Sequence, residues 1–276
     1  MIKQAIIPLA GLGTRLLPLT SVFAKELLPI NGKPGLEYIL DECIEAGIKE
    51  IVFIISKKKM MIKKYFYNDK FYKDIIKKKG DPKIIKEYKK ILKYKKMIKF
   101  VFQDKPLGTG DAVYKTKKFI TDKYFLMLLP DDLIIKKNCS KSMIAIHQRF
   151  KMPVMASMKV NKRDVSRWGI YNIKKKIDKN NFIINKVVEK PSIETSPSNN
   201  AVIGRYILPK IIFSKLKSLK PGKSGEFHIT DAIQALIEDD NQFIGHNFSG
   251  KYLDCGTMKG YIKSTLEISK QWNFAW

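Results

Sequence analysis

Apolar runs of strand length alternate with helical patterns through the first half of the chain. Lys3–Leu9 and Ile51–Ile55 are predicted strands, and the second is a continuous β-branched run, typical of a strand buried on both faces of a parallel sheet. Between them, Gly35–Ala46 carries apolar residues on one helical face, and Gly47 ends that helix. The alternation continues with helical segments in 59–93, a strand at Ile98–Phe102, a helix at Asp111–Phe119, a strand at Tyr124–Leu129 and a helix at Ser140–Phe150.

The second half is richer in strands. The pattern predicts strands at Val154–Val160, Gly169–Ile173, Phe182–Val188 and Ala201–Ile207, and helices at Pro209–Leu216, Thr230–Ile237 and Met258–Ile268. Neither an internal repeat nor a Gly/Ser linker marks a boundary. We therefore expect one α/β domain over 1–276, with a Rossmann-like, mixed but mostly parallel central sheet flanked by helices.

Composition narrows the class of protein. The chain has 276 residues and no apolar run near the ~18 residues that a membrane span needs. The N-terminus lacks the order of segments that marks a signal peptide. The cysteines are odd in number and far apart, which indicates neither a disulfide framework nor a metal pair (Cys43, Cys139 and Cys255). These features predict a cytoplasmic protein without membrane attachment.

The charge is strongly basic, with 53 Lys and Arg against 26 Asp and Glu and a formal net charge of +27. Such a charge suits a nucleic-acid binder, a membrane-surface protein or an enzyme for anionic substrates. Arginine, which groove readers and phosphate clamps favour, is rare here, so we interpret much of the excess as lysine spread over the surface and expect no nucleic-acid partner.

About half of the excess lies between Lys57 and Lys99, where 18 lysines and four acids alternate with tyrosines and phenylalanines. One interpretation is a polyanion-binding arm. The favoured one is a Lys-rich helical insertion over 57–97, whose aromatic residues pack down while lysine stems cover the outer face.

A glycine-rich turn follows the first predicted strand. Pro8-Leu9-Ala10-Gly11-Leu12-Gly13-Thr14-Arg15 stands at the carboxyl end of that strand, where an α/β sheet forms its ligand crevice. Small residues let backbone N–H groups approach a phosphate or base, and Arg15 adds a fork for phosphate oxygens. Lys25, ten residues later, would face the same polyphosphate if the loop folded back. The alternative is a tight turn with a surface arginine.

This run, continued by Lys25-Glu26-Leu27-Leu28-Pro29 and Lys33-Pro34, resembles the signature of sugar-nucleotide pyrophosphorylases, and more narrowly of bacterial UTP–glucose-1-phosphate uridylyltransferases. The resemblance implies the nucleotide-diphospho-sugar transferase fold. It also implies that Arg15 and Lys25 hold the leaving pyrophosphate. The other residues that it assigns to the nucleotide are Ala10, Gly11, Gly13, Thr14, Glu26, Gln103 and Gly108.

The segment Gln103-Asp104-Lys105-Pro106-Leu107-Gly108-Thr109-Gly110-Asp111 resembles the part of the family that recognises uracil, where Gln103 and the Gly108 backbone would face the base. Asp111 is a departure, because the usual residue there is histidine. An aspartate at this position still suits a helix N-cap or first turn.

Paired carboxylates, Asp131 and Asp132, follow the predicted strand Tyr124–Leu129. In a crevice for phosphates such carboxylates are natural Mg²⁺ ligands, and the alternative is an Asp-rich turn. By resemblance Asp131 is a metal ligand, completed by Asp254, and Asp132 supports the loop or the sugar side.

The sugar phosphate has its own set of residues in the family. By resemblance Glu189 binds sugar hydroxyls, Lys190 binds the sugar phosphate, and Gly169 lets the sugar approach the backbone. Trp168 stands where the family usually has tyrosine. Gly204, Arg205 and their neighbours match the family as architecture.

The resemblance implies a Mg²⁺-dependent transferase that makes UDP-glucose and pyrophosphate from UTP and α-D-glucose 1-phosphate, and a homo-oligomer, dimer or tetramer. The closest alternative is a glucose-1-phosphate thymidylyltransferase. A non-catalytic regulatory homologue and a polyanion-binding protein are further alternatives.

Overall fold

The computed structural model describes residues 2–222 and 225–270, and the remainder of the predicted 1–276 domain lies outside the described residues. A nine-stranded sheet forms the centre, in the order β5-β4-β1-β6-β11-β8-β12-β10-β9. Its strands are β1 (Gln4–Pro8), β4 (Glu50–Ile55), β5 (Ile98–Phe102), β6 (Tyr124–Leu128), β8 (Val154–Lys159), β9 (Gly169–Lys176), β10 (Asn181–Glu189), β11 (Asn200–Pro209) and β12 (Ile244–Asn247).

Strand direction confirms a mixed and mostly parallel sheet. β1 lies parallel to β4 and β6, with Ala5 opposite Ile51 and Leu126, and β4 lies parallel to β5. β11 is antiparallel to both of its neighbours, β6 and β8, while β12 runs parallel to β8. The carboxyl ends of β1 and β6 therefore meet at one edge of the sheet.

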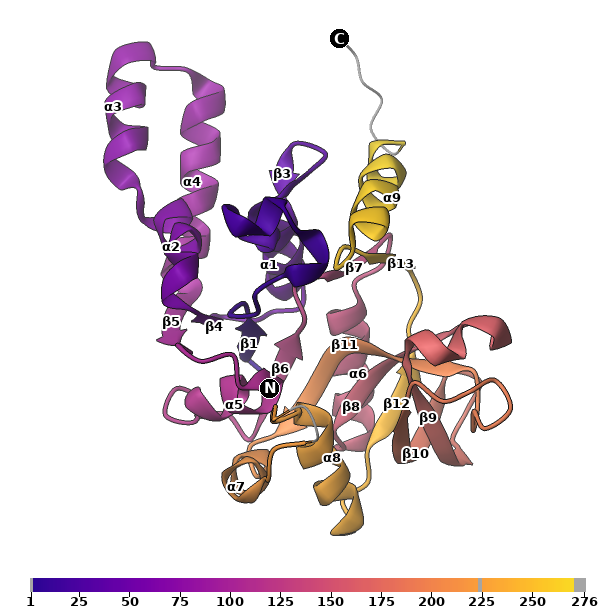
Figure 1. Ribbon diagram of the computed structural model, residues 1–276. Coiled ribbons are helices and arrows are strands. Elements are labelled where there is room, and N and C mark those ends of the chain that lie inside the picture. The colour runs from indigo at the N-terminus through magenta and orange to yellow at the C-terminus, as the bar shows by residue number, and fades with distance from the viewer. Residues whose placement is uncertain (1, 223–224, 271–276) are drawn as a thin grey trace.

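Helices cover both faces of the sheet, as a doubly wound fold requires (Figure 1). The helices are α1 (Gly35–Glu45), α2 (Met60–Tyr67), α3 (Asp69–Lys79), α4 (Pro82–Met97), α5 (Gly108–Lys115), α6 (Cys139–Phe150), α7 (Ile212–Ser218), α8 (Ile229–Glu238) and α9 (Met258–Ser269). Alternate side chains of β1 pack on opposite faces of the sheet. Ala5 and Ile7 belong to the core under α1, α2, α4 and α6, whereas Ile6 belongs to the core under α5, α7 and α8. This is the two-residue period of a strand with both faces buried.

Two small sheets lie outside the central one. β2 (Pro29–Ile30) pairs with β3 (Lys33–Pro34), and β7 (Asp132–Ile135) pairs antiparallel with β13 (Lys251–Asp254). In the β7–β13 pair Asp132 stands opposite Asp254, so two predicted site residues from distant parts of the chain become neighbours.

The Lys-rich segment is helical, as predicted. Figure 1 shows α3 and α4 as a hairpin that extends away from the sheet, with α2 at its base. Phe66 and Tyr94 are fully buried, and Tyr72 stacks on Tyr88 with 5.0 Å between ring centroids. Phe71, however, is 54% exposed, so the expected inward packing of the aromatics holds only in part.

Two further findings concern the cysteines and the apolar character of the helices. Cys43, Cys139 and Cys255 are buried and free, and no disulfide joins them. Over the described ranges, no helix has both the length and the apolar character needed to cross a membrane.

Candidate active site

The glycine-rich loop leaves the end of β1 and folds back on itself. Gly13 has a φ of +72°, a conformation that favours glycine. The hydroxyl of Thr20 donates to Gly13 O at 2.8 Å, and a Cβ on Gly13 would lie 3.1 Å from the Thr20 methyl group. This closed loop returns Lys25 to the strand end at which it began.

Lys25 and Arg15 converge on one carboxylate oxygen. Lys25 Nζ lies 2.6 Å from Asp131 Oδ2, and Arg15 Nη2 lies 3.4 Å from the same atom. The predicted fold-back of Lys25 beside Arg15 is therefore confirmed. Lys25 is largely buried, whereas the Arg15 side chain is 65% exposed.

Both members of the buried pair stay ionised. Burial lowers the pKa of Lys25, but the attraction of Asp131 and Glu26 outweighs it and leaves that pKa above its usual value. Burial likewise raises the pKa of Asp131, but Lys25 and Arg15 reverse the effect and hold that pKa below its usual range. The site thus presents a fixed carboxylate beside two cations at neutral pH.

A second carboxylate approaches the same space. A Cβ on Gly256 would lie 2.8 Å from Asp131 Oδ2 and 3.2 Å from Asp254 Oδ1, so both oxygens border one small volume that only glycine leaves open. The backbone fixes this arrangement, because Cys255 N donates to Asp131 O and Gly256 N donates to Asp254 Oδ1, each at 2.8 Å.

This pair of carboxylates fits Mg²⁺. Mg²⁺ in phosphate sites is usually held by one or two carboxylates, substrate phosphates and water. Residues 2–222 and 225–270 contain no group of three or more His, Cys, Asp or Glu side chains placed to hold a metal.

Glu26 is held by a lysine that sequence analysis did not single out. Lys59 Nζ donates to both Glu26 carboxylate oxygens at 2.8 Å, and both side chains are buried. Burial lowers the pKa of Lys59, and Glu26 offsets only part of that shift. Because Lys59 is one of three consecutive lysines, nothing in the sequence distinguished it from a surface residue.

The loop after β5 forms the other wall of the site. Gln103 is almost fully buried, and its Nε2 donates to Gly108 O at 3.1 Å and to Asp111 Oδ2 at 2.7 Å. Gly108 has a φ of +94°, and a Cβ there would lie 2.5 Å from Phe227 O. The chain therefore needs glycine at 108 for both its conformation and its close contact with Phe227.

These walls enclose a cavity of about 480 Å³. It brings together nine residues that were predicted to hold the nucleotide or act on it, namely Ala10, Gly11, Gly13, Thr14, Lys25, Glu26, Gln103, Gly108 and Asp131. Glu226, which sequence analysis did not identify, also lines it.

Asp132 is braced from two sides. Gly204 N donates to Asp132 Oδ2 at 2.8 Å, and Tyr252 Oη donates to Asp132 Oδ1 at 2.7 Å. Burial and the charge of Asp131 raise the Asp132 pKa to about 6. This geometry favours support of the loop over direct contact with a sugar, two roles that the sequence left open.

A buried ion pair holds the backbone on either side of Asp131. Arg205, which has no exposed surface, donates through Nε and Nη2 to Glu42 and through its two Nη atoms to the carbonyls of Leu129, Gly204 and Asp132. Arg205 was expected to be architectural, whereas its partner Glu42 gave no signal beyond its place on a helix.

The predicted sugar-binding residues meet at the ends of β9 and β10. Gly169 stands opposite Glu189, and a Cβ on Gly169 would lie 3.1 Å from Glu189 Oε2. Lys190 is exposed and anchored by its backbone N–H, which donates to Trp168 O at 3.0 Å. In the described residues no hydrogen bond or ion pair joins Glu189 or Lys190 to Asp131 or Asp254.

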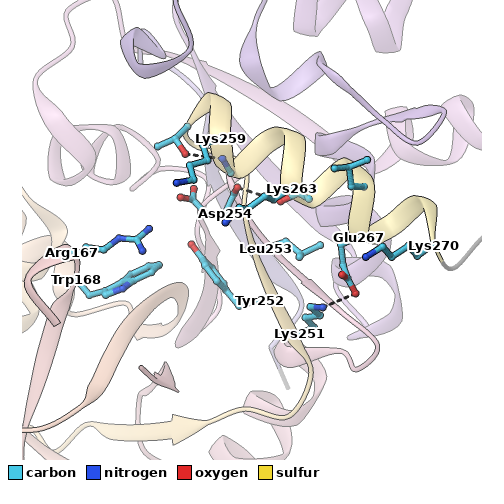
Figure 2. A pocket seen from close by; sticks show the side chains of 14 residues that line it. Arg167, Trp168, Lys251, Tyr252, Leu253, Asp254, Lys259, Lys263, Glu267 and Lys270 are labelled. Atoms are coloured by element: carbon cyan, nitrogen blue, oxygen red, sulfur yellow. Dashed lines mark hydrogen bonds and ion pairs between the residues drawn. The ribbon is translucent and has the colours of Figure 1, made fainter. Parts of the chain in front are cut away.

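A second cavity, of about 670 Å³, has Asp254 in its wall. Figure 2 shows Arg167 and Trp168 on one wall and Lys259 and Lys263, from α9, on the other. The Trp168 ring packs edge-on against Tyr252 at 5.4 Å, so Trp168 fills the aromatic position next to Gly169 and touches the residue that braces Asp132.

Comparison with known proteins decides the family. Residues 4–271 match the model of the nucleotidyl transferase family. The chain belongs to this family. The predicted resemblance is confirmed, because this nucleotidyl transferase is 35% identical over 271 residues to a putative UTP–glucose-1-phosphate uridylyltransferase of Methanocaldococcus jannaschii, covering 98% of this chain and 94% of the relative.

Solved structures agree. A UDP-glucose pyrophosphorylase complexed with UDP-glucose matches this nucleotidyl transferase with a TM-score of 0.86 and 33% identity, over 99% of this chain and all of that one. A UTP-bound enzyme of the same kind from Acinetobacter baumannii matches with a TM-score of 0.89 and 30% identity, over 99% of this chain and 95% of that one.

Proposed function

We propose that this nucleotidyl transferase makes UDP-glucose and pyrophosphate from UTP and α-D-glucose 1-phosphate. The observation that carries the proposal is the cavity that joins the glycine-rich loop, the Gln103–Gly108 wall and the Lys25–Asp131 pair. Relatives named for this reaction, similar over nearly the whole chain, support it.

The proposed reaction is an in-line attack of a sugar phosphate oxygen on the α-phosphorus of UTP. The bond to the α-phosphorus forms as the bond to the leaving pyrophosphate breaks, and no general base is needed because the sugar phosphate is already ionised. Since both reactants are anions, the main tasks are to bring them together and to stabilise charge in the transition state.

The residues divide these tasks. Arg15 and Lys25 take the pyrophosphate, the loop residues Ala10, Gly11, Gly13 and Thr14 line the nucleotide, and Lys190 takes the sugar phosphate. Glu189 and Gly169 contact the sugar, and Glu26, which is paired with Lys59, lines the nucleotide. Asp131 and Asp254 would hold Mg²⁺, which when bound neutralises charge on the two reacting phosphates.

A panel of nucleotides and sugar phosphates tests the proposal. We expect pyrophosphate release to be fastest with UTP and α-D-glucose 1-phosphate, and to stop when a chelator removes divalent metal. Faster release with dTTP would favour the thymidylyltransferase alternative. No release with any pair would favour a regulatory homologue, which the presence of Thr14, Arg15, Lys25 and Asp131 in one site argues against.

Single substitutions test the assignment of the charged groups. Asp131→Asn and Arg15→Ala should each lower turnover by about a hundredfold or more, because the first weakens the proposed Mg²⁺ site and the second removes a cation that stabilises the leaving pyrophosphate. Asp239→Asn, on the surface ion pair with Lys215, is the matched control and should leave turnover unchanged. Near-normal turnover in Asp131→Asn with a folded protein would refute the assignment.

The remaining parts of the proposal concern the whole protein. We place it in the cytoplasm as a homo-oligomer, dimer or tetramer, in which 57–97 is an insertion in a single catalytic domain. Light scattering on the purified chain measures the oligomeric state, and a monomeric mass at working concentration would contradict it.

A further inference from the structure

The side-chain amide of Gln103 has only one orientation that satisfies its neighbours. Its two close partners, Gly108 O and Asp111 Oδ2, are both oxygen acceptors, at 3.1 and 2.7 Å. A carbonyl and an ionised carboxylate cannot donate, so both partners require the NH₂ end of the amide. The carbonyl end, Oε1, is therefore turned away from Asp111 and accepts no hydrogen bond from the described residues.

Asp111 contributes more than Gly108 O to fixing this orientation of the amide. Its contact with Nε2 is shorter than the contact with Gly108 O, and a hydrogen bond to a charged acceptor is stronger than one to a neutral carbonyl. Asp111 itself is fixed in the first turn of α5, where acidic residues are favoured, and lies 3.5 Å from Lys115 Nζ one turn later.

A donor stands beside this acceptor. Gly108 is the first residue of α5, and the N–H groups of a first helical turn have no acceptor within their own helix. Gly108 and Gln103 both line the 480 Å³ cavity. Because both residues line the cavity, we take Gln103 Oε1 as the acceptor and Gly108 N–H as the donor that this wall presents to a base.

We infer that Asp111 is a positioning residue that selects the base: by fixing the Gln103 amide it makes the cavity accept an imide edge and reject cytosine. Uracil and thymine present an N–H donor next to a carbonyl acceptor, which matches this wall. Cytosine presents a ring-nitrogen acceptor next to an amino donor, so both of its groups meet a group of the same kind. This inference rests on the proposed function, because it takes the Gln103 wall to be the base end of the nucleotide site.

Without Asp111 the Gln103 amide loses the stronger of the two hydrogen bonds that fix its orientation. A rotated amide would offer Nε2 to the ring nitrogen of cytosine, and only the weaker hydrogen bond to Gly108 O would oppose the rotation. Loss of one hydrogen bond of this kind changes a binding constant by about tenfold. The preference for UTP over CTP is therefore the quantity that reports on Asp111.

Calorimetric titration of the full chain with UTP or CTP, each with equimolar Mg²⁺ and without sugar phosphate, measures this preference without turnover. The unaltered protein should prefer UTP by at least about tenfold, and Asp111→Ala should reduce that preference by about tenfold. Asp111→Asn keeps the shape of the side chain but can donate as well as accept, so it should reduce the preference too, and it serves if Asp111→Ala does not fold.

Two controls separate positioning from a structural role. Lys115→Ala removes the lysine that pairs with Asp111 and should leave the preference unchanged. In a Gln103→Met background, adding Asp111→Ala should not change the preference further, because the amide through which Asp111 acts is gone.

Three results would overturn the inference: equal binding of UTP and CTP by the unaltered protein, an equal loss of both in Asp111→Ala, or a further change of preference in the Gln103→Met background. Selective UTP binding without pyrophosphate release from UTP in the presence of any sugar phosphate would instead contradict the proposed function and leave the role of Asp111 standing.

Discussion

Gly256 sits where the charged groups of the site leave no room for a side chain. A Cβ there would lie 2.8 Å from Asp131 Oδ2 and 2.9 Å from Arg15 Nη2. Both atoms are the far ends of side chains, so the protein can fold around an added methyl group by displacing them. That displacement would remove the alignment on which the proposed chemistry depends.

Gly256→Ala should therefore lower turnover by at least about tenfold while the temperature of unfolding changes little. Pyrophosphate release and thermal denaturation of the same preparation measure the two effects. Full turnover in this variant would mean that Asp131 and Arg15 do not act from the positions seen here.

At the scale of single residues, sequence analysis found the groups that belong to motifs. Arg15, Lys25 and Asp131 follow strand ends in recognisable runs, and the structure brings them within contact of one another. Lys59 and Glu42 were missed because each acts through one buried contact across the fold, and neither its type nor its spacing marks it in a chain rich in charged residues.

Among the elements, β11, α1 and the turn between β6 and β7 are tied together by Arg205 and Glu42. Removing one member of a buried ion pair leaves the other charge unpaired, which costs about 3–5 kcal/mol. Glu42→Gln should lower the free energy of unfolding by this amount and loosen the loop that carries Asp131.

Urea denaturation followed by circular dichroism measures the loss. Glu45→Gln is the matched control, because Glu45 lies three residues further along α1 and its side chain is exposed. The control should change the free energy of unfolding by less than about 1 kcal/mol. Equal effects of the two substitutions would show that the buried network does not stabilise the fold.

Long or strongly patterned elements were predicted well, and short ones were not. β5 was predicted at its observed bounds, whereas β7, β12 and β13 have four residues each and were missed. β12, Ile244-Gly245-His246-Asn247, lacks a strand-like pattern, and its place between β8 and β10 fixes it.

Boundaries also moved where tertiary contacts decide them. The helix expected at Asp111–Phe119 instead spans Gly108–Lys115. Its start is set by Gly110 N, which donates to Phe227 O at 2.7 Å, a residue more than a hundred positions away. Similarly, Pro209 ends β11 instead of starting a helix.

Across the whole molecule, the net charge of +27 divides between buried pairs, the site and the surface. Some lysines of the 57–97 segment form ion pairs with the rest of the fold, as Lys59 does with Glu26 and Lys90 with Glu37. Others, such as Lys77, Lys78 and Lys79 at the end of α3, are exposed on the hairpin seen in Figure 1. If the segment is a polyanion-binding arm, these exposed lysines are the residues that would contact the polyanion.

We predict that this hairpin binds polyanions only weakly. Contacts between scattered lysines and phosphates release counterions, so their affinity falls steeply with salt. In a filter-binding assay, single-stranded RNA retained at about 10 mM salt should be released by about 150 mM, where non-specific dissociation constants reach about 10⁻⁴–10⁻⁶ M.

Replacing Lys77, Lys78 and Lys79 by Gln should weaken the low-salt binding and leave turnover unchanged, because the three residues lie outside both cavities. Retention of RNA at about 150 mM salt that this variant abolishes would contradict the prediction and identify the hairpin as a polyanion arm.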